Sequence, residues 1–348
     1  MFKRFCFVLA VLFAFPINAY ASDNIVSAYS YITVDSGSLT VLSSNNAYET
    51  LSMASTTKIM TCLLACESGK LNTVVTVTDE MVDTEGSSIY LEAGDKITLM
   101  DLVKGAMLAS GNDAANAIAI TLAGSIDAFA DMMNERAKQI GMYDTVFVTP
   151  SGLDKGEHHS TAYDMALLTC EAVQNKTFLS VCSLKSAEIT VNSKNTTIYN
   201  HNKLLNTDSN YVGVKTGFTE KAGRCLISAY EYKGNIIVCV TLNAPDDWDD
   251  HKKLISSAKS KYITIHSDDE YTINVVGGVK QYVKCSANCT VSCVNSTYVK
   301  VHYYPFAYAP VRKGDALGEQ IVYSNGRIIK ITPIRAVEDI DLWQEITK

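Results

Sequence analysis

The sequence predicts an α+β fold followed by a small all-β region. Helical and strand patterns are mixed from Ile25 to about Ile265, whereas the chain after about Asp268 contains only short strand-like segments separated by turns. The 348 residues are 47% hydrophobic and 19% charged, an ordinary globular composition with a length that suits two domains. We therefore expect one domain over residues 22–266 and a β-sandwich-like domain over residues 267–348.

The start of the chain has the pattern of an export signal. Lys3 and Arg4 precede an apolar run over Phe5–Phe15, and a small-x-small site follows at Ala19–Ala21. An uncleaved membrane anchor is disfavoured because this run is too short to span a hydrocarbon core about 30 Å thick. We predict a signal peptide over residues 1–21 and an exported protein, located in the cell wall or on the outer face of the cytoplasmic membrane.

Local patterns predict the elements of the first domain in order. A turn cluster at residues 35–38 between alternating segments predicts an opening hairpin. Apolar spacing, glycine stops and capping patterns predict helices over Thr56–Glu67, Thr98–Leu108, Asn112–Leu122, Thr161–Val173 and Trp248–Tyr262. Strands are expected over Tyr211–Phe218, Cys225–Tyr232 and Ile236–Leu242, the last two joined as a hairpin.

The second domain is predicted from short strands alone. These strands are expected over Tyr271–Val276, Tyr298–Tyr304, Glu319–Tyr323 and Arg327–Ile331, with glycine-containing turns between them. A small β-sandwich or barrel is the natural arrangement for such segments.

The charge and the cysteines limit the function further. A formal net charge of −7 repels polyanions, so we expect no nucleic-acid partner. Of ten cysteines, Cys6 lies in the predicted leader, which leaves an odd number in the exported chain. Cys285, Cys289 and Cys293 recur at every fourth position but lack a nearby fourth ligand for zinc. Free thiols, one disulfide and a metal site all stay open at this point.

Three short motifs carry the chemistry. Ser55–Lys58 reads S-T-T-K at the start of a predicted helix, so the first and last side chains share a face. A serine needs a base to become a nucleophile, and lysine can serve if burial or a nearby cation lowers its pKa. Ser110–Asn112 reads S-G-N at a junction between two helices, where a tight turn can aim both polar side chains into one cleft.

The third motif is the K-T-G of Lys215–Gly217, which occurs once and lies on a predicted strand. Strand alternation places Lys215 and Gly217 on one face and Thr216 on the other. A glycine there lets a substrate backbone lie close to the strand, and the lysine can hold a carboxylate and lower the pKa of Lys58.

Each motif has an ordinary structural explanation when taken alone. S-x-x-K recurs at Ser256–Lys259 on a predicted surface helix, and S-D-N recurs at Ser22–Asn24 beside the leader. The three motifs in this order, however, resemble the set of penicillin-binding proteins and class A β-lactamases.

Most of the chain is similar to the low-molecular-mass D-alanyl-D-alanine carboxypeptidases, which are serine-type penicillin-binding proteins. The matching segments are Met53–Ile59, Met107–Ala117, Thr149–Asp154, His159–Ala162 with Asp164, Gly213–Gly217, Lys221–Gly223 and, weakly, Ala309–Asp315. The resemblance implies a penicillin-binding-protein/β-lactamase-like transpeptidase domain, in which helical layers cover an antiparallel sheet, followed by a small all-β domain.

The resemblance also implies roles for the matching residues. Ser55 would attack the carbonyl between the two terminal D-alanines of a peptidoglycan stem peptide, and Lys58 would take its proton. Ser110 and Asn112 would relay protons and orient the substrate amide. D-Alanine would leave, and water would hydrolyse the acyl-enzyme. β-Lactams would acylate Ser55 in the same way, and neither a metal nor another cofactor is required.

Substrate binding is assigned to the strand that carries the third motif. By resemblance, Lys215 and Thr216 would bind the terminal carboxylate beside Gly217. Backbone N–H groups of Ser55 and Phe218 would hold the oxyanion.

Competing functions remain at this point. A DD-endopeptidase uses the same acyl transfer, and a non-catalytic penicillin-sensing or wall-binding module is a further alternative. A class A β-lactamase is disfavoured by Gly111 within the second motif and by the additional β-domain. His159, Thr161 and Asp164 do not indicate a Ser-His-Asp triad, because the chain lacks G-x-S-x-G and a helix cap explains the last two. His158 and His159 also lack the spacing of a zinc peptidase.

The C-terminus has an amphipathic pattern. Val337, Ile340, Trp343 and Ile346 recur at every third position, as in helices that lie on membranes. The net charge over residues 335–348 is −2, whereas such helices are usually rich in Lys and Arg. We expect at most a weak peripheral membrane contact through the C-terminus.

Overall fold

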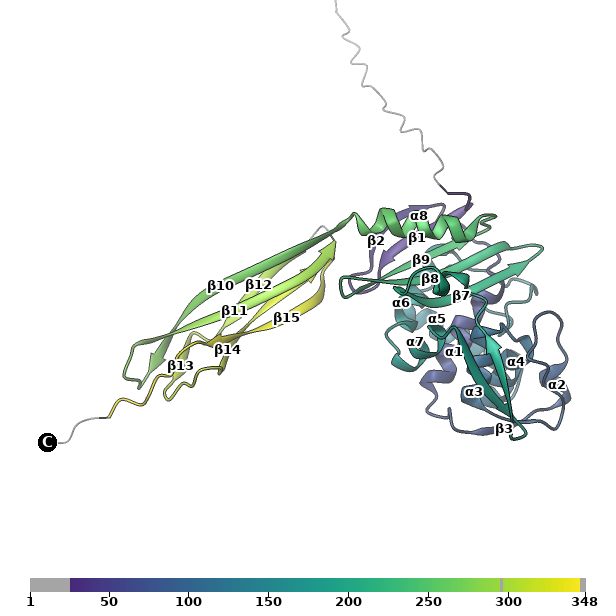
Figure 1. The fold of residues 1–348 in the computed structure, drawn as a ribbon, viewed down its shortest axis with the longest axis horizontal. Helices are drawn as coiled ribbons and strands as arrows, with labels where there is room; N and C mark the ends of the chain where they lie inside the picture. Colours follow the sequence, from purple (N-terminus) through teal and green to yellow (C-terminus); the bar gives the residue numbers. More distant parts are fainter. Residues whose placement is uncertain (1–25, 295–296, 345–348) are drawn as a thin grey trace, which may run out of the picture.

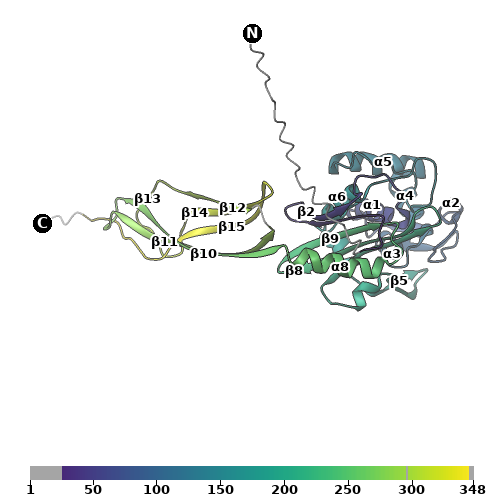
Figure 2. The same ribbon diagram turned by 90° about the horizontal axis from the view of Figure 1, so that it is seen from above.

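The computed structural model describes residues 26–294 and 297–344 (Figure 1). The predicted signal peptide at residues 1–21 lies outside the described residues. A mixed α/β domain, here the N-terminal domain, precedes β10 (Tyr262–Val276), and an all-β region, here the C-terminal β-domain, begins with that strand. Figures 1 and 2 both show the β-domain extending from one side of the N-terminal domain. The predicted fold class is confirmed, whereas the predicted limit between residues 266 and 267 falls within β10 and stays a prediction.

A five-stranded antiparallel sheet forms the centre of the N-terminal domain, in the order β2-β1-β9-β8-β7. The strands are β1 (Ser30–Asp35), β2 (Thr40–Asn45), β7 (Tyr211–Thr219), β8 (Gly223–Tyr232) and β9 (Asn235–Leu242). The opening hairpin pairs with the late strands because β1 lies against β9. This order leaves β7, the strand with the K-T-G motif, at the edge of the sheet.

Helices cover both faces of this sheet. On β8, Cys225 and Ile227 face one apolar core, whereas Leu226 and Tyr230 face a second core with α8 (Asp247–Lys259). The larger core contains the other long helices, which are α1 (Lys58–Glu67), α3 (Leu99–Leu108), α4 (Asn112–Ala123), α5 (Ile126–Ile140), α6 (Ala162–Ala172) and α7 (Lys176–Cys182). Because strand side chains alternate, a strand covered on both faces reads as a continuous apolar run.

Helix α1 lies inside the helical layer. Ile59, Met60 and Leu63 are fully buried, and each such side chain contributes roughly 1.5–3 kcal/mol through burial. A short 3-10 turn, η1 (Ala54–Thr57), precedes α1 and carries Ser55. The apolar packing of α1 therefore fixes the position of the first motif.

Several elements were not expected from the sequence. They are α2 (Asp79–Val82), α5, α7, η2 (Lys203–Asn206) and a small sheet of β3 (Val74–Thr76), β4 (Lys96–Thr98), β5 (Ser186–Val191) and β6 (Lys194–Tyr199). Most side chains of β5 and β6 are exposed, so no apolar alternation marks them. Their signal is the turn at Asn192 and Ser193, which both have positive φ, as two-residue hairpin turns require.

The C-terminal β-domain is a six-stranded sheet in the order β12-β14-β15-β11-β10-β13. After β10 its strands are β11 (Tyr282–Val294), β12 (Thr297–Tyr303), β13 (Phe306–Tyr308), β14 (Ala316–Ser324) and β15 (Arg327–Ala336). Strand β11 was missed because cysteines at every fourth position obscured its pattern. A spacing of four is twice the strand period, so Cys285, Cys289 and Cys293 share one face, and all three are buried.

The C-terminal segment corrects one expectation. Val337–Gln344 is not helical, because Ile340 forms an isolated bridge with Val311 and Leu342 forms one with Gly278. Ile340 is fully buried in the β-domain core. Of the described positions in the pattern that suggested a membrane-surface helix, Ile340 packs in the core, whereas Val337 and Trp343 are exposed; Ile346 lies outside the described residues.

None of the cysteines in the described ranges forms a disulfide. Over the same ranges, no group of His, Cys, Asp and Glu side chains is arranged to hold a metal ion. No helix within residues 26–294 and 297–344 is long and apolar enough to cross a membrane.

Candidate active site

The first motif forms a serine–lysine pair. Ser55 lies in η1 and Lys58 begins α1, so the two side chains point into the same space one turn apart. Lys58 Nζ lies 3.0 Å from Ser55 Oγ. Ser55 borders a cleft, whereas Lys58 is fully buried beneath it. A lysine can therefore exchange a proton with the serine without contacting bulk water.

The surroundings of Lys58 favour a neutral amine. Burial, and secondly the positive charge of Lys215, hold the pKa of Lys58 well below its usual value. Lys58 Nζ donates to Asn112 Oδ1 and to the Ser151 carbonyl, both at 2.6 Å. A neutral amine has two N–H groups, which these two oxygens accept, so its lone pair is left facing Ser55. This is the arrangement that a general base requires.

The second motif is placed by the junction of two helices. Helix α3 ends at Leu108 and α4 begins at Asn112. Between them Ser110 adopts a φ of 63°, a left-handed conformation that is costly for a serine and is common at functional sites. The Asn112 side chain is fixed because its Nδ2 donates to the Glu85 carbonyl at 2.6 Å. Its carbonyl oxygen must then face Lys58.

The third motif contributes a second buried cation. Lys215 is 1% exposed, and its Nζ donates to Ser110 Oγ at 3.0 Å and to the Thr216 carbonyl at 2.9 Å. Burial lowers the pKa of Lys215 to about 7. Lys215 therefore lies beneath Ser110, which lines the cleft. The hydrogen bond between them places the lysine charge next to the cleft without exposing it to solvent.

Gly217 allows β7 to lie against the turn that carries the nucleophile. A Cβ at this position would lie 3.1 Å from both Ala54 Cβ and the Ser55 backbone nitrogen. We expected the glycine to admit a substrate backbone, and the structure adds this contact within the chain itself. Thr216, Gly217 and Phe218 line the cleft, with the Phe218 ring largely exposed.

The cleft brings the predicted residues together. It has a volume of about 360 Å³ and is lined by Ser55, Ser87, Ser110, His201, Lys203, Thr216, Gly217, Phe218, Arg224, Asp247 and Trp248. Lys58 and Asn112 lie just beneath its surface, in contact with Ser55 and with each other. The three motifs, which are far apart in the sequence, thus form one site.

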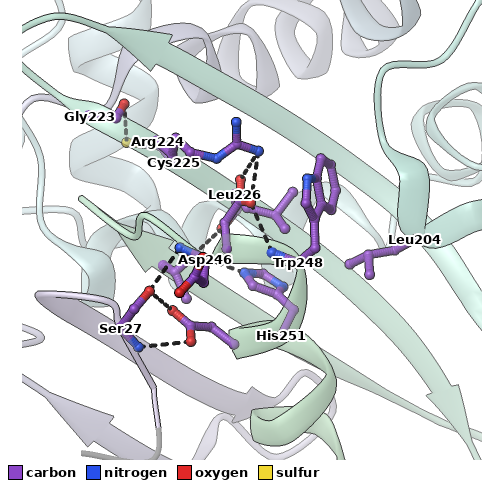
Figure 3. A network of polar contacts seen from close by, with 12 residues as sticks. Ser27, Leu204, Gly223, Arg224, Cys225, Leu226, Asp246, Trp248 and His251 are labelled. Carbon is purple, nitrogen blue, oxygen red and sulfur yellow. Dashed lines mark hydrogen bonds and ion pairs between the residues drawn. The ribbon is translucent and has the colours of Figure 1, made fainter.

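Sequence reasoning missed one end of this cleft, where Arg224, Asp247 and Trp248 meet. Arg224 Nη2 donates to the two Asp247 carboxylate oxygens at 2.8 and 3.0 Å, and its guanidinium lies 5.8 Å from the Trp248 ring centre (Figure 3). The Arg224 side chain is 42% exposed, so other N–H groups can reach a ligand. The pairing of β7 with β8 could have indicated this residue, because its register places Arg224 directly opposite Phe218.

Residues 149–154 are among the segments whose sequence matches the family, but no role in the site was predicted for this loop. Ser151 supplies the carbonyl that accepts from Lys58, yet a backbone oxygen has no sequence signature. His158 is buried and its Nε2 lies 2.9 Å from Thr57 Oγ1. Thr161 accepts from the Asp164 backbone at the start of α6, as its capping interpretation requires.

These features have the geometry that serine acyl transfer requires, with a nucleophile 3.0 Å from a buried lysine whose pKa is lowered. The sequence profile described as D-alanyl-D-alanine carboxypeptidase (peptidase S11) matches residues 18–246. The chain belongs to this family, whose members are serine-type D-alanyl-D-alanine carboxypeptidases.

Individual relatives agree with this assignment. D-Alanyl-D-alanine carboxypeptidase DacC of Escherichia coli is 33% identical, covering 95% of this chain and 90% of that protein. The corresponding DacF of Bacillus subtilis is 29% identical, covering 90% of this chain and 86% of that protein. The crystal structure of penicillin binding protein 5 from Haemophilus influenzae has a TM-score of 0.65 at 25% identity, covering 91% of this chain and 98% of that chain.

Proposed function

We propose that this protein removes the terminal D-alanine from peptidoglycan stem peptides through an acyl-enzyme on Ser55. The observation that carries the proposal is the 3.0 Å separation of Ser55 Oγ from the buried, proton-poor amine of Lys58. Family membership supports the substrate class and the reaction.

Acylation follows from the positions of three side chains. Ser55 Oγ bonds to the carbonyl carbon between the two D-alanines while its proton passes to Lys58 Nζ. The carbonyl oxygen becomes an oxyanion, which the backbone N–H groups of Ser55 and Phe218 would stabilise. When the C–N bond breaks, the proton held by Lys58 passes through the Ser110 hydroxyl to the departing amine, which leaves Lys58 neutral again for deacylation.

Deacylation reverses these roles. Water attacks the ester carbon and gives one proton to Lys58, and the Ser55–carbonyl bond breaks as Ser55 Oγ regains a proton. Asn112 keeps the Lys58 amine oriented in both half-reactions because its own amide is anchored on Glu85. The products are D-alanine and a stem peptide shortened by one residue.

Recognition of the free carboxylate belongs to the edge strand and the adjoining hairpin. The Thr216 hydroxyl and the exposed donors of Arg224 would contact the carboxylate directly. Lys215 would add positive charge from behind Ser110. Charge-assisted contacts of this kind are about twice as strong as neutral hydrogen bonds.

β-Lactam antibiotics would acylate the same serine, because their cyclic amide presents a carbonyl and a nearby carboxylate. The leaving nitrogen stays tethered to the acyl group, so the inhibitor remains attached after ring opening. Neither step requires a metal ion or another cofactor.

Two assays on the exported form test this function. A fluorescent penicillin should label the wild type and not Ser55→Ala, and mass analysis should detect D-alanine released from a pentapeptide. Absence of label on the wild type would contradict the acyl-enzyme mechanism. Label without D-alanine release would favour an endopeptidase or a penicillin-sensing module.

We also propose that the protein acts outside the cytoplasm and touches the membrane weakly at the far end of the β-domain. Val279, Leu342 and Trp343 are exposed there on paired segments, with the Trp343 backbone donating to the Gly277 carbonyl. Aromatic and aliphatic side chains of this kind suit the headgroup region of a bilayer. Co-sedimentation with liposomes should fall for Trp343→Ser; equal recovery of both forms would contradict the contact.

A further inference from the structure

A buried histidine connects the nucleophile turn to the loop beneath the catalytic lysine. His158 is 1% exposed and follows the loop of residues 149–154. One ring nitrogen faces this loop and the other faces Thr57, which lies between Ser55 and Lys58 in the sequence. No step of the reaction described above uses this side chain.

The hydrogen bonds define the tautomer of His158. Backbone N–H groups of Val148 and Thr149 donate to Nδ1 at 3.0 and 3.4 Å, so Nδ1 is the acceptor. The ring proton then lies on Nε2, which donates to Thr57 Oγ1 at 2.9 Å. The Thr57 hydroxyl in turn donates to the Ala54 carbonyl at 2.8 Å. The imidazole thus links the start of the loop to both sides of Ser55.

The loop contacts the catalytic lysine and the residues on either side of it in η1 and α1. The Ser151 carbonyl accepts from Lys58 Nζ at 2.6 Å, and the Pro150 carbonyl accepts from Thr61 Oγ1 at 2.7 Å. Gly152 has a φ of +88°, and a Cβ there would lie 1.9 Å from the Ala54 carbonyl oxygen. There is no clearance between the loop and the η1 turn, so a shift of one would displace the other.

The imidazole must be neutral to make these contacts. Burial lowers the pKa of His158 to about 4, with Asp154 opposing the shift and His159 and Lys221 adding to it. An imidazolium has no acceptor nitrogen and would lose both backbone donors. At neutral pH the connection is therefore complete.

We infer that His158 is a positioning residue for the serine–lysine pair, holding the Ser151 carbonyl and the Ser55 turn in the one geometry that directs the Lys58 lone pair at Ser55. The inference rests on the proposed function, because it concerns the acylation of Ser55. Its effect is exerted through Thr57 and the loop, not through contact with substrate.

The alternative is that His158 only stabilises the fold, and a second histidine in the chain provides the control. His251 is fully buried on α8, where Nδ1 lies 2.7 Å from Ser228 Oγ and Nε2 lies 3.0 Å from Thr241 Oγ1 (Figure 3). Burial lowers the pKa of His251 to about 3. Both of its ring nitrogens are hydrogen-bonded, as are those of His158, but it touches neither the loop nor the nucleophile turn.

The test compares matched variants in the full exported chain. His158→Asn preserves a hydrogen-bond acceptor near the position of Nδ1, and His158→Gln preserves an amide donor near the position of Nε2. His251→Asn and His251→Gln are the matched controls. Thr57→Val removes the shared hydroxyl, and Thr169→Val is its control because Thr169 is a buried helical threonine that donates to the Met165 carbonyl. The measurements are the melting temperature and the rate constant of penicillin acylation per folded molecule.

We expect both histidine series to lower the melting temperature, but only His158 and Thr57 variants to slow acylation, by tenfold or more. Their acid limb in the pH profile of acylation should also move to higher pH. Water admitted beside Lys58 raises the pKa of that amine, while its other charged neighbours, Lys215 and Asp113, and the Cys62 thiol stay in place.

The inference is overturned if His158 and Thr57 variants acylate at the wild-type rate with the wild-type pH profile while losing stability like the controls. If the His158 variants do not fold, the Thr57→Val and Thr169→Val pair decides in the same way. A wild type that no penicillin labels would instead contradict the proposed function, so the two failures are distinguishable.

Discussion

The two domains differ in where their ionisable side chains lie. In the N-terminal domain, Lys58, Lys215 and Asp113 are nearly inaccessible to solvent and lie within one cluster. Within the described part of the C-terminal β-domain, no charged side chain is buried, and ion pairs such as Arg312–Asp341 lie at the surface. Exposed pairs contribute at most about 1 kcal/mol, whereas a buried cation can have its pKa shifted by several units. The groups whose pKa can be shifted far enough for catalysis therefore lie in the N-terminal domain, where ionisable side chains are buried.

The buried ionisable groups are tolerated because each has hydrogen-bond partners inside the protein. Lys58 donates to a side chain and a carbonyl, and Asp113 accepts from the backbone of Ile89 and Leu91 and from the Ser88 hydroxyl. In the β-domain, apolar side chains such as Val283 and Ile334 fill the interior, and the charged side chains of its described part lie at the surface. Substitutions matched between the two domains test this contrast.

The largest effect is expected at the nucleophile. Ser55→Ala should reduce D-alanine release by more than about 1,000-fold, because no other group can form the acyl-enzyme. Ser256→Ala is the matched control, since Ser256 has the same S-x-x-K spacing but is exposed on α8. Mass analysis of product measures both, and equal loss in the two variants would contradict the assignment of the site.

Variants of Arg224 and Arg312 compare an ion pair in the cleft with an ion pair on the surface of the β-domain. Arg224→Ala should lower kcat/KM roughly tenfold or more, since a hydrogen bond to a charged group contributes about 1.5–3 kcal/mol. Arg312→Ala, which breaks a pair in the β-domain, should leave kcat/KM unchanged. A substrate with an amidated C-terminus should show no further loss with Arg224→Ala; the same loss with both substrates would exclude carboxylate recognition.

The pH dependence of stability should reveal the buried cations. Burial lowers the pKa of Lys215 from 10.5 to about 7, so between these values the unfolded chain binds a proton that the folded chain does not. The free energy of unfolding should therefore rise with pH between about 7 and 10.5, and this residue contributes up to about 1.4 kcal/mol per pH unit to the rise. The contribution of Lys215 to stability is lowest below this window. Lys58 adds a slope of the same sign.

The matched pair for this measurement is Lys215→Met and Lys300→Met. Lys215→Met should flatten the curve of unfolding free energy against pH, whereas Lys300→Met, at an exposed β-domain position, should not. An unchanged slope in Lys215→Met would mean that the lysine keeps its ordinary affinity for protons in the folded chain.

The smallest effect is expected at the contact between the domains. Asn325 Nδ2 donates to the Ser38 carbonyl at 3.2 Å, and Asn325 has a φ of 48°. Asn325→Gly retains this backbone conformation and removes the hydrogen bond, so stability should fall by about 1 kcal/mol or less. Denaturant unfolding measures this, and D-alanine release should be unchanged. A large loss of activity would show that the β-domain contributes to the cleft.

Local patterns identified most of the chemistry. Ser55 and Lys58 could be paired from spacing alone, because one helical turn places i and i+3 side chains together. The hairpin around Gly234 and the helix ending near Leu108 were likewise correct. Two local periods had more than one explanation: β11 was missed, and the spacing around Ile340, which is typical of a membrane-surface helix, belongs to a segment that is not helical and packs Ile340 in the β-domain core.

Other parts of the site had no local signal. Arg224 reaches the cleft because β8 pairs with β7, and the Ser151 carbonyl reaches Lys58 because a loop packs on η1. His158 was set aside because it fitted no metal motif, yet its two ring nitrogens join that loop to Thr57. Contacts between distant segments depend on packing, which residue spacing does not contain.

The amino-acid sequence specifies which groups are present: two serines, two lysines and an asparagine in three motifs, on elements whose types could be predicted. What those groups can do depends on how the folded chain surrounds them. Lys58 becomes a candidate base because α1, β7 and the loop of residues 149–154 exclude water from it and place Lys215 nearby. Desolvation and charge proximity set a pKa, and both arise when segments remote in the chain are packed together.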